Sequence, residues 1–299
     1  MAADLPTVLK IQKERFMRYN QEWKDYQILA TSNGEKLERW GKYTLLRPDP
    51  QVIWKGADLK YFGNVDGHYI RGNSGGGYWD FKTKLPESWV VGWRDLKFKI
   101  VPMGFKHTGL FPEQAYNWVR MMEKIKGANR PIKVLNLFAY TGGATVACAK
   151  AGASVTHVDA SKGMVERAKE NLRLSSLQDA PVRTIIDDCE KFVGREIKRG
   201  NFYDAIILDP PSYGRGPNGE VWKIEDKVFD LLKLCKKVLS DKPLFVLLNS
   251  YTTGLQPTVL KNICKLCFDC FEKFDEYELG IPTDQNIILP CGASCFCEN

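Results

Sequence analysis

The sequence lacks long apolar runs and dense blocks of one charge. Its 299 residues contain no stretch of 18 uninterrupted apolar residues, so a membrane-spanning helix is not expected. The N-terminal text MAADLPTVLKIQKERF has no apolar signal core, which favours a cytoplasmic location. The composition, 44% hydrophobic and 26% charged, is typical of a globular protein with one large domain or two ordinary ones.

The cysteines number nine, and an odd count without a signal core indicates reduced thiols rather than disulfides. Six of them fall in two groups near the C-terminus: Cys264, Cys267, Cys270, Cys291, Cys295 and Cys297. A spacing of three can serve an iron–sulfur cluster, but VLKNICKLCFDCF also has the period of a helix that buries one face. We favour core or idle thiols and predict no metal site.

The net charge of +7 is unevenly placed along the chain. Lys and Arg outnumber Asp and Glu by 22 to 14 in residues 1–130, whereas the balance is 21 to 22 in residues 131–299. This asymmetry favours a polyanionic partner for the first part, most commonly nucleic acid. The alternative is a merely basic surface.

The N-terminal third reads as one helix followed by β-structure. Residues 7–30 have the pattern of a charged amphipathic helix. From Trp40 to Val101, short aromatic and β-branched runs are separated by Asp-Pro, Asp-Gly and triple-glycine signals, which predicts antiparallel strands. Five of the eight tryptophans lie there. They could stack on bases, but we favour a core role, which is commoner for aromatic residues in strands.

From Lys133 onward, apolar runs alternate with helical text. The runs are KVLNLFA, SVTHVDA, VRTIIDD, YDAIILD and PLFVLLNS. Such alternation predicts a mostly parallel sheet covered on both faces. We therefore expect an α/β fold with a smaller β-rich domain in residues 1–105 and a doubly wound domain in residues 106–299. A last strand, NIILPCGAS, is expected to be followed by a short stub. Ligands of such sheets bind at the carboxyl ends of the strands.

Polar residues and glycines follow the first two strands. Tyr140-Thr141-Gly142-Gly143 opens a helix, and a glycine pair there lets a ligand approach backbone amides. The fingerprint G-x-G-x-x-G is absent, which counts against a nicotinamide cofactor. Asp159 ends the second strand, where an acid can accept ribose hydroxyls or simply cap a helix. Ser161 is expected to be the N-cap residue.

The next two strands also end in acids. The third ends in Asp187-Asp188-Cys189, which could clamp an adenine edge or form a polar turn. The fourth ends in Asp209-Pro210-Pro211. Together the four strand ends resemble the class I S-adenosylmethionine-dependent methyltransferases over roughly residues 100–255.

Within that class, LNLFAYTGG and DPPSYG look like the subfamily that methylates bases of large-subunit ribosomal RNA. The usual motif D-x-G-x-G-x-G is altered: Asn136 replaces the acid, Phe138 and Tyr140 replace two glycines, and Gly142 remains. The segment GFKHTGLFPEQ, residues 104–114, is similar to one that closes over the cofactor in that subfamily.

The resemblance implies S-adenosylmethionine as cofactor and assigns residues to it. It places Phe138, Tyr140, Thr141 and Gly142 at the methionine half, Asp159 at the ribose, Asp188 and Cys189 at the adenine, and Asp209 beside the transferred methyl group. Ser161, which adjoins Asp159, is also counted among the cofactor-binding residues. The approach segment adds His107, Thr108 and Gln114 as weaker candidates. His157 is expected to be a buried structural residue, and His68 a surface one.

The resemblance also explains the Asp-Pro-Pro sequence. In adenine-N6 and guanine-N2 methyltransferases, the loop D/N-P-P-Y/F accepts a hydrogen bond from the target amine. Pro210 and Pro211 would fix that backbone in advance, and an aromatic ring would stack on a flipped-out base. Here Ser212 intervenes, so Tyr213 comes one place late. Glycines at 214, 216 and 219 predict a flap that orders on RNA.

These signals predict direct methyl transfer to a base nitrogen of ribosomal RNA. Carbon 5 of cytosine is not expected to be the methylated atom, because its methylation needs an enzyme thiolate. The two places where the subfamily carries that cysteine hold Ser212 and the text LLNSYTTG, residues 247–254. The alternatives are a methyltransferase acting on a small molecule or protein, and a non-catalytic RNA-binding module of the same fold.

Overall fold

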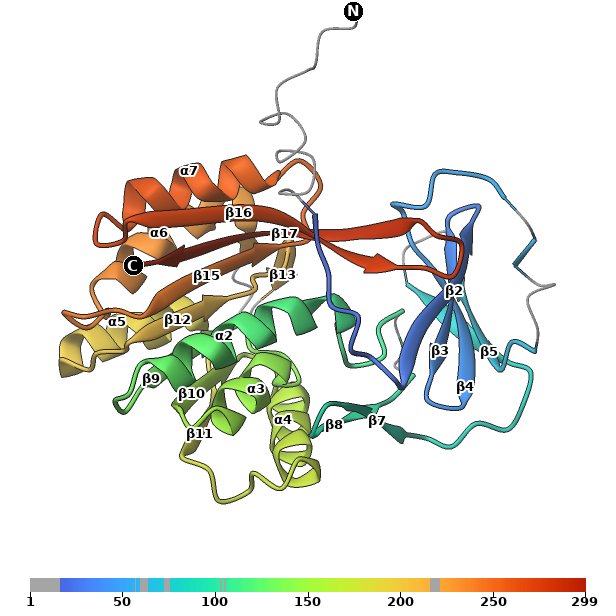
Figure 1. The fold of residues 1–299 in the computed structure, drawn as a ribbon, viewed down its shortest axis with the longest axis horizontal. Coiled ribbons are helices and arrows are strands. Elements are labelled where there is room, and N and C mark those ends of the chain that lie inside the picture. Colours follow the sequence, from blue (N-terminus) through green and yellow to red (C-terminus); the bar gives the residue numbers. More distant parts are fainter. Residues whose placement is uncertain are drawn as a thin grey trace, which may run out of the picture.

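The computed structural model describes residues 17–56, 58–59, 64–72, 76–102, 104, 106–215 and 221–299. A layered α/β part lies beside a smaller β-rich part, and a long two-stranded ribbon runs between them (Figure 1). No helix of the described chain is long and apolar enough to cross a membrane.

The larger part is built on an eight-stranded sheet. Its strand order is β1 (Met17–Arg18), β16 (Lys273–Pro282), β17 (Ile288–Glu298), β15 (Phe245–Ser250), β12 (Ala205–Leu208), β9 (Lys133–Leu137), β10 (Ser154–Asp159), β11 (Val182–Ile186). The strands from β15 to β11 are parallel, and β17 runs antiparallel to both of its neighbours. The order reverses between β9 and β12, which makes a crevice at their carboxyl ends.

Helices cover both faces of this sheet (Figure 1). One face packs against α2 (Ala115–Gly127), α3 (Gly143–Lys150) and α4 (Lys162–Leu174), and the other against α5 (Cys189–Arg199), α6 (Ile224–Lys236) and α7 (Pro257–Cys267). Along β9, Val134 belongs to the first core and Leu135 to the second. Two buried faces explain the continuous apolar strands, and the predicted fold class is confirmed.

The smaller part contains a five-stranded sheet. Its order is β2 (Tyr26–Ser32), β3 (Glu35–Trp40), β4 (Tyr43–Pro48), β5 (Gly67–Arg71), β6 (Gly77–Phe81). A separate hairpin, β7 (Trp89–Trp93) and β8 (Leu96–Ile100), leads to the 3-10 turn η2 (Pro112–Gln114). Trp40 and Trp93 are fully buried, and the other three tryptophans of this region pack partly buried against the same core. The aromatic residues thus serve the core.

The helix expected over residues 7–30 is wrong where it can be compared. Residues 7–16 lie outside the described residues, but residues 17–30 contain no helix: Met17–Arg18 forms β1 and Tyr26–Ser32 forms β2. The overlooked signal is Asn33-Gly34, whose φ angles of 52° and 80° make the tight turn favoured between antiparallel strands. Tyr26, Ile28 and Ala30 then alternate inward.

The C-terminal ribbon reaches from the large sheet to the small one (Figure 1). At its tip, Ile28 of β2 bridges to Thr283, and the Thr31 amide donates to Gln285 Oε1 over 2.7 Å. The expected stub after residue 294 is wrong, because β17 continues to Glu298 and its residues 293–298 pair with β15. The N-terminal strand β1 also joins the large sheet, so the two parts exchange strands on both sides of residues 105/106. The domain boundary expected there stays a prediction.

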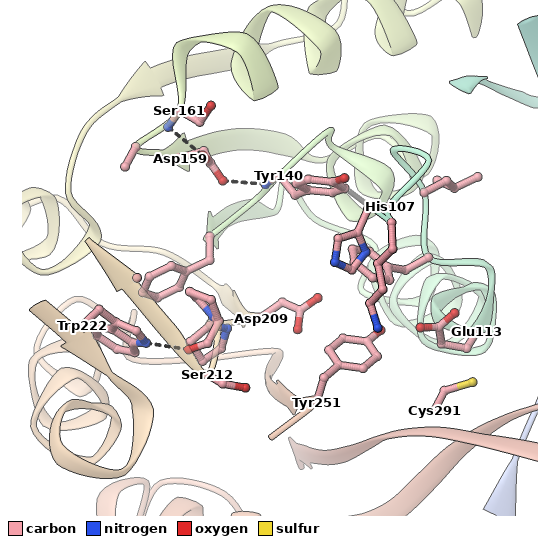
Figure 2. A pocket seen from close by; sticks show the side chains of 18 of the residues that line it. His107, Glu113, Tyr140, Asp159, Ser161, Asp209, Ser212, Trp222, Tyr251 and Cys291 are labelled. Carbon is pink, nitrogen blue, oxygen red and sulfur yellow. Dashed lines mark hydrogen bonds between the residues drawn. The ribbon is translucent and has the colours of Figure 1, made fainter. Parts of the chain in front are cut away.

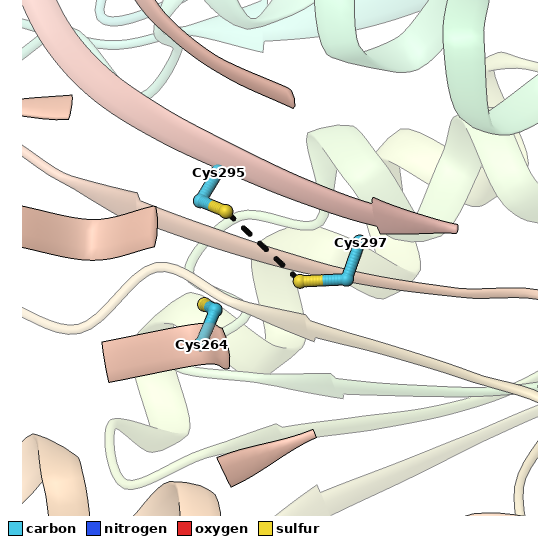
Figure 3. A group of neighbouring side chains, drawn as sticks. All are labelled: Cys264, Cys295 and Cys297. Atoms are coloured by element: carbon cyan, nitrogen blue, oxygen red, sulfur yellow. Dashed lines mark hydrogen bonds between the residues drawn. The ribbon is translucent and has the colours of Figure 1, made fainter. Parts of the chain in front are cut away.

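Three cysteine sulfurs meet in the core beneath β17 (Figure 3). Cys264 of α7 faces Cys295 and Cys297 of β17; the three sulfurs lie within 4.8 Å of one another, and all three residues are fully buried. Hydrogen bonds among the thiols and burial raise the pKa of Cys264. Cys267 is buried on the same helix, whereas Cys270 is exposed. Among the described residues, Cys264, Cys267 and Cys270, which are spaced three apart, therefore do not come together as ligands of a typical four-cysteine iron–sulfur cluster.

Candidate active site

A cavity of about 970 Å³ opens where the strand order reverses (Figure 2). Its floor is formed by the ends of β9, β10 and β12, and residues 106–113 and β3–β4 of the smaller part form the opposite wall. The cavity therefore has an end on the sheet and an end that faces the N-terminal region. Its position is the one that the sheet topology predicts.

The loop after β9 turns two aromatic rings into the cavity. Phe138 and Tyr140 have φ angles of 53° and 50°, a left-handed conformation that is costly for bulky residues. Two hydrogen bonds hold it: the Phe138 amide donates to Cys189 Sγ over 3.3 Å, and the Tyr140 amide donates to Asp159 Oδ2 over 2.8 Å. Within the described residues, the buried Tyr140 hydroxyl has no hydrogen-bond partner.

The glycine pair after these aromatics has a packing reason. A Cβ on Gly142 would lie 2.8 Å from Cβ of Ala168, and one on Gly143 would lie 2.7 Å from Cζ2 of Trp118. Gly142 also has a φ of 82°. The expected role, opening the turn to a ligand, is therefore not needed to explain these glycines; α3 simply cannot pack here with a larger residue.

Three residues assigned to the cofactor do not line this cavity: Thr108, Thr141 and Gly142. Thr108 and Thr141 are both buried, and the Thr141 hydroxyl donates to the Gly109 carbonyl over 2.6 Å. Thr141 instead borders a small neighbouring cavity of about 50 Å³. Seven assigned residues do line the main cavity: Phe138, Tyr140, Asp159, Ser161, Asp188, Cys189 and Asp209.

Asp159 is held by the backbone at the end of β10. Its Oδ2 accepts from the Tyr140 amide and its Oδ1 from the Ser161 amide, each over 2.8 Å. Burial raises the pKa of Asp159, and these two bonds act against that rise. Each carboxylate oxygen has a second acceptor position, so both can still accept a hydrogen bond from a hydroxyl group of a ligand. Ser161 is the N-cap residue of α4 by position, but its side chain makes no capping bond.

Asp188 and Cys189 begin α5. Asp188 Oδ1 accepts from the Lys191 amide over 2.8 Å and so caps the helix. Cys189 is buried behind the Phe138 turn, and burial raises the pKa of its thiol. Asp188 thus forms the polar turn that the sequence allowed, and both residues line the cavity; their role at the adenine stays a prediction.

Asp209 follows β12 at the centre of the cavity (Figure 2). Burial raises the pKa of Asp209 to about 7, opposed by a hydrogen bond that Asn249 Nδ2 donates to Oδ1 over 2.8 Å. At neutral pH this carboxyl therefore exchanges between its charged and neutral forms. Pro210 is buried, and the Pro211 carbonyl accepts from Trp222 Nε1 over 2.7 Å.

The aromatic ring beside the Asp-Pro-Pro loop is Trp222 rather than Tyr213. Tyr213 lies on β13 (Tyr213–Arg215), is 54% exposed and does not line the cavity, whereas Trp222 on the paired β14 (Val221–Lys223) does. The Trp222 ring lies 4.9 Å from that of Phe138. The inserted Ser212 moves Tyr213 out, and the hairpin brings Trp222 in. Of the predicted flap, Gly214 is on β13, and residues 216 and 219 lie outside the described residues.

The wall opposite Asp209 was mostly missed by the sequence patterns. Phe111 lies between the rings of His107, Tyr140 and Tyr251, at 5.4, 5.4 and 5.3 Å. Burial lowers the pKa of His107 to about 4, so this ring is neutral at pH 7. Nearby Glu113 also lines the cavity, and burial raises its pKa. Only the approach segment, residues 104–114, pointed to this wall.

The end of the cavity that faces the small sheet carries paired charges. Arg47 and Glu38 form a buried two-point ion pair, with Arg47 Nε 2.6 Å from Glu38 Oε2 and Arg47 Nη2 2.8 Å from Oε1. Lys36 Nζ lies 3.1 Å from Asp49 Oδ2. Burial lowers the pKa of Lys106, which adjoins them. Most of the positive charge here is therefore already compensated.

Comparison with known proteins agrees with this geometry. The fold is shared with a putative S-adenosylmethionine-dependent methyltransferase from Streptococcus mutans, at a TM-score of 0.73 and 18% identity over 94% of this chain and 76% of that one. The model of the S-adenosylmethionine-dependent methyltransferase family matches residues 61–254. The chain belongs to this family, and its cofactor is S-adenosylmethionine.

Two further proteins are similar to this chain at higher sequence identity. A S-adenosylmethionine-dependent methyltransferase from Agrobacterium tumefaciens is 35% identical, with a TM-score of 0.89 over 94% of this chain and 93% of that one. The ribosomal RNA large subunit methyltransferase K/L of Shewanella frigidimarina is 36% identical over 146 residues, 48% of this chain and 20% of the relative. The chain thus spans about a fifth of that curated relative.

Proposed function

We propose that this methyltransferase transfers its methyl group to a base nitrogen of ribosomal RNA. The observation that carries the proposal is the cavity-lining Asp209, whose carboxyl is anchored on one side and has a pKa of about 7. Such a group can accept the hydrogen bond, and then the proton, of an amine nitrogen near neutral pH. The names of the curated relatives support RNA as the substrate class.

S-adenosylmethionine, when bound, supplies an electrophilic methyl group. Asp159 would hold the ribose, and the rings of Phe138 and Tyr140 would line the cofactor's place on the sheet side. The protein's own contribution is positioning, because a direct displacement gains most from alignment of the reacting atoms. Trp222 is our candidate for the ring that stacks on the target base.

Methylation of carbon 5 of cytosine needs an enzyme thiolate, and the cavity-lining thiols Cys189 and Cys291 are unsuited to that role. Burial raises the pKa of both, and the charge of Glu113 adds to the rise at Cys291. A thiol in such a setting is a poor nucleophile. Ser212, which stands in one of the two places where the subfamily carries that cysteine, is hydrogen-bonded to Thr252 Oγ1 over 2.6 Å.

Residues 1–105 are proposed as the RNA-binding part, with residues 106–299 as the catalytic part. The support for this assignment is the basic excess of the chain, which lies in residues 1–130; it does not come from Lys36 and Arg47, which are paired with Asp49 and Glu38. A ribosomal substrate would place the protein in the cytoplasm. Binding of the full chain to ribosomal RNA should weaken steeply with salt; salt-independent binding would contradict an electrostatic clamp.

The deciding experiment is to incubate the protein with methyl-labelled cofactor and unmodified ribosomal RNA, and to digest the product to nucleosides. We expect label in an N-methylated purine. Asp209→Ala should abolish transfer and leave cofactor binding by calorimetry largely intact, whereas Cys291→Ala should keep activity. Label in 5-methylcytidine would overturn the choice of acceptor, and an unlabelled RNA would favour a small-molecule or protein substrate.

A further inference from the structure

Three buried polar side chains form a chain of hydrogen bonds that ends at Asp209. Asn249 of β15 donates to Asp209 Oδ1 over 2.8 Å, Ser294 Oγ of β17 donates to Asn249 Oδ1 over 2.7 Å, and Asn117 Nδ2 of α2 lies 3.4 Å from Ser294 Oγ. Asn249, Ser294 and Asn117 are at most 1% exposed. We call these three residues the relay. Burying so many polar groups is costly unless each finds a partner.

The direction of every bond in the relay follows from its two ends. While Asp209 is ionised, its carboxylate only accepts, so Asn249 turns its NH₂ group to Asp209 and its carbonyl to Ser294. Ser294 then donates its single proton to Asn249 and accepts from Asn117. At the far end, the hydroxyl of buried Tyr277 donates to Asn117 Oδ1 over 2.5 Å. A single arrangement of amides and hydroxyls satisfies the whole chain.

Asn117 also serves the opposite wall of the cavity. Its Nδ2 donates to Gln114 Oε1 over 2.8 Å, and Gln114 Nε2 donates to the Tyr251 hydroxyl over 2.9 Å. Tyr251 stacks on Phe111 at 5.3 Å and lines the cavity (Figure 2). One buried amide on α2 is thus joined to both sides of the space in which a substrate would lie.

We propose that Asn249, Ser294 and Asn117 are positioning residues that fix the rotation of the Asp209 carboxyl, with Oδ1 held by the protein and Oδ2 left for the substrate. The proposed function supplies the identity of that substrate, but the orientation of Asp209 is independent of it. Ser294 lies on β17, outside the residues matched by the family model, 61–254, whereas Asn249 and Asn117 lie within them.

Ser294→Ala is the sharpest test because it removes one oxygen atom and leaves Asn249 Oδ1 without its donor. We expect kcat to fall about tenfold or more, the Kd for S-adenosylmethionine to stay within about twofold, and the acidic limb of the pH–rate profile to move to higher pH. The matched control is Cys297→Ala, which lies on the same strand, is equally buried and is outside the relay. It should lower the unfolding temperature without changing kcat or the pH profile.

A second measurement needs no substrate. The carboxyl-carbon resonance of Asp209, titrated by NMR in the wild type, Ser294→Ala and Asn249→Ala, should show the pKa rising in both variants, since each loses or weakens the bond that opposes the effect of burial. If the wild type fails to methylate RNA but these titrations move as described, the proposed function fails and the relay stands. If the wild type methylates RNA and neither titration nor kcat moves, the relay is refuted.

Discussion

Replacing Asp209 by asparagine should make the protein more stable and inactive. The folded-state pKa of about 7 compares with an ordinary value of 3.8. For an acid whose pKa is raised by folding, the contribution to stability is complete below pH 3.8 and is lost as the pH rises through 7. A rise from 3.8 to about 7 corresponds to about 4 kcal/mol of destabilisation at pH 8. The asparagine carbonyl can still accept from Asn249.

The assay is thermal or urea unfolding of the wild type and Asp209→Asn between pH 4 and pH 8. We expect nearly equal stabilities at pH 4 and an advantage of about 2–4 kcal/mol for the variant at pH 8, the lower figure applying where cavity water solvates the carboxylate. Asp204→Asn is the control of opposite sign, because hydrogen bonds and Arg130 lower the pKa of Asp204 despite its partial burial. A wild type more stable than Asp209→Asn at pH 8 would refute the reasoning.

Three further substitutions test other parts of the site. Asp159→Ala should weaken cofactor binding by about 1.5–3 kcal/mol, the loss expected for hydrogen bonds to a charged group; calorimetry showing a Kd within twofold would reject the ribose assignment. Arg47→Met should cost about 3–5 kcal/mol of stability, because Glu38 stays buried and keeps the longer 3.8 Å contact with Lys36 in place of its two-point pair. Adding Glu38→Gln should recover much of that loss in urea unfolding. Gly143→Ala should lower the unfolding temperature, because its Cβ would meet Trp118 at 2.7 Å; an unchanged temperature would show that α2 can shift.

The parallel sheet could be predicted because its evidence is local. Each central strand is buried on both faces, so it consists of a short apolar run such as AIIL of β12. Such a run can be recognised as a strand from its own residues, without knowing which strands pair with it. The region around residues 7–30 misled because charged and apolar residues recur there at helical spacing, while pairing with β3 decides the conformation of β2. Tertiary pairing overrode the local pattern.

The site was predictable only where a motif occupies consecutive residues. Asp159 and Asp209 follow their strands directly, so both could be named. Trp222 could not, because its place depends on how the β13–β14 hairpin pairs across residues 216–220, which lie outside the described residues. The relay depends on the register that sets Asn249 opposite Ser294, 45 residues apart in the chain. No pattern in one segment carries that information.

The central position of β17 has a consequence for the order of assembly during synthesis. This strand comes last along the described chain, yet it lies between β15 and β16 within the sheet. While the ribosome is still adding these residues, the strands from β9 to β15 can already form their cofactor-binding edge, but the gap beside β15 stays open and Asn249 lacks its donor. If Asp159 and the relay act as proposed, a nascent chain would gain affinity for S-adenosylmethionine before it gains an oriented Asp209, and full activity would follow the entry of the last strand into the sheet.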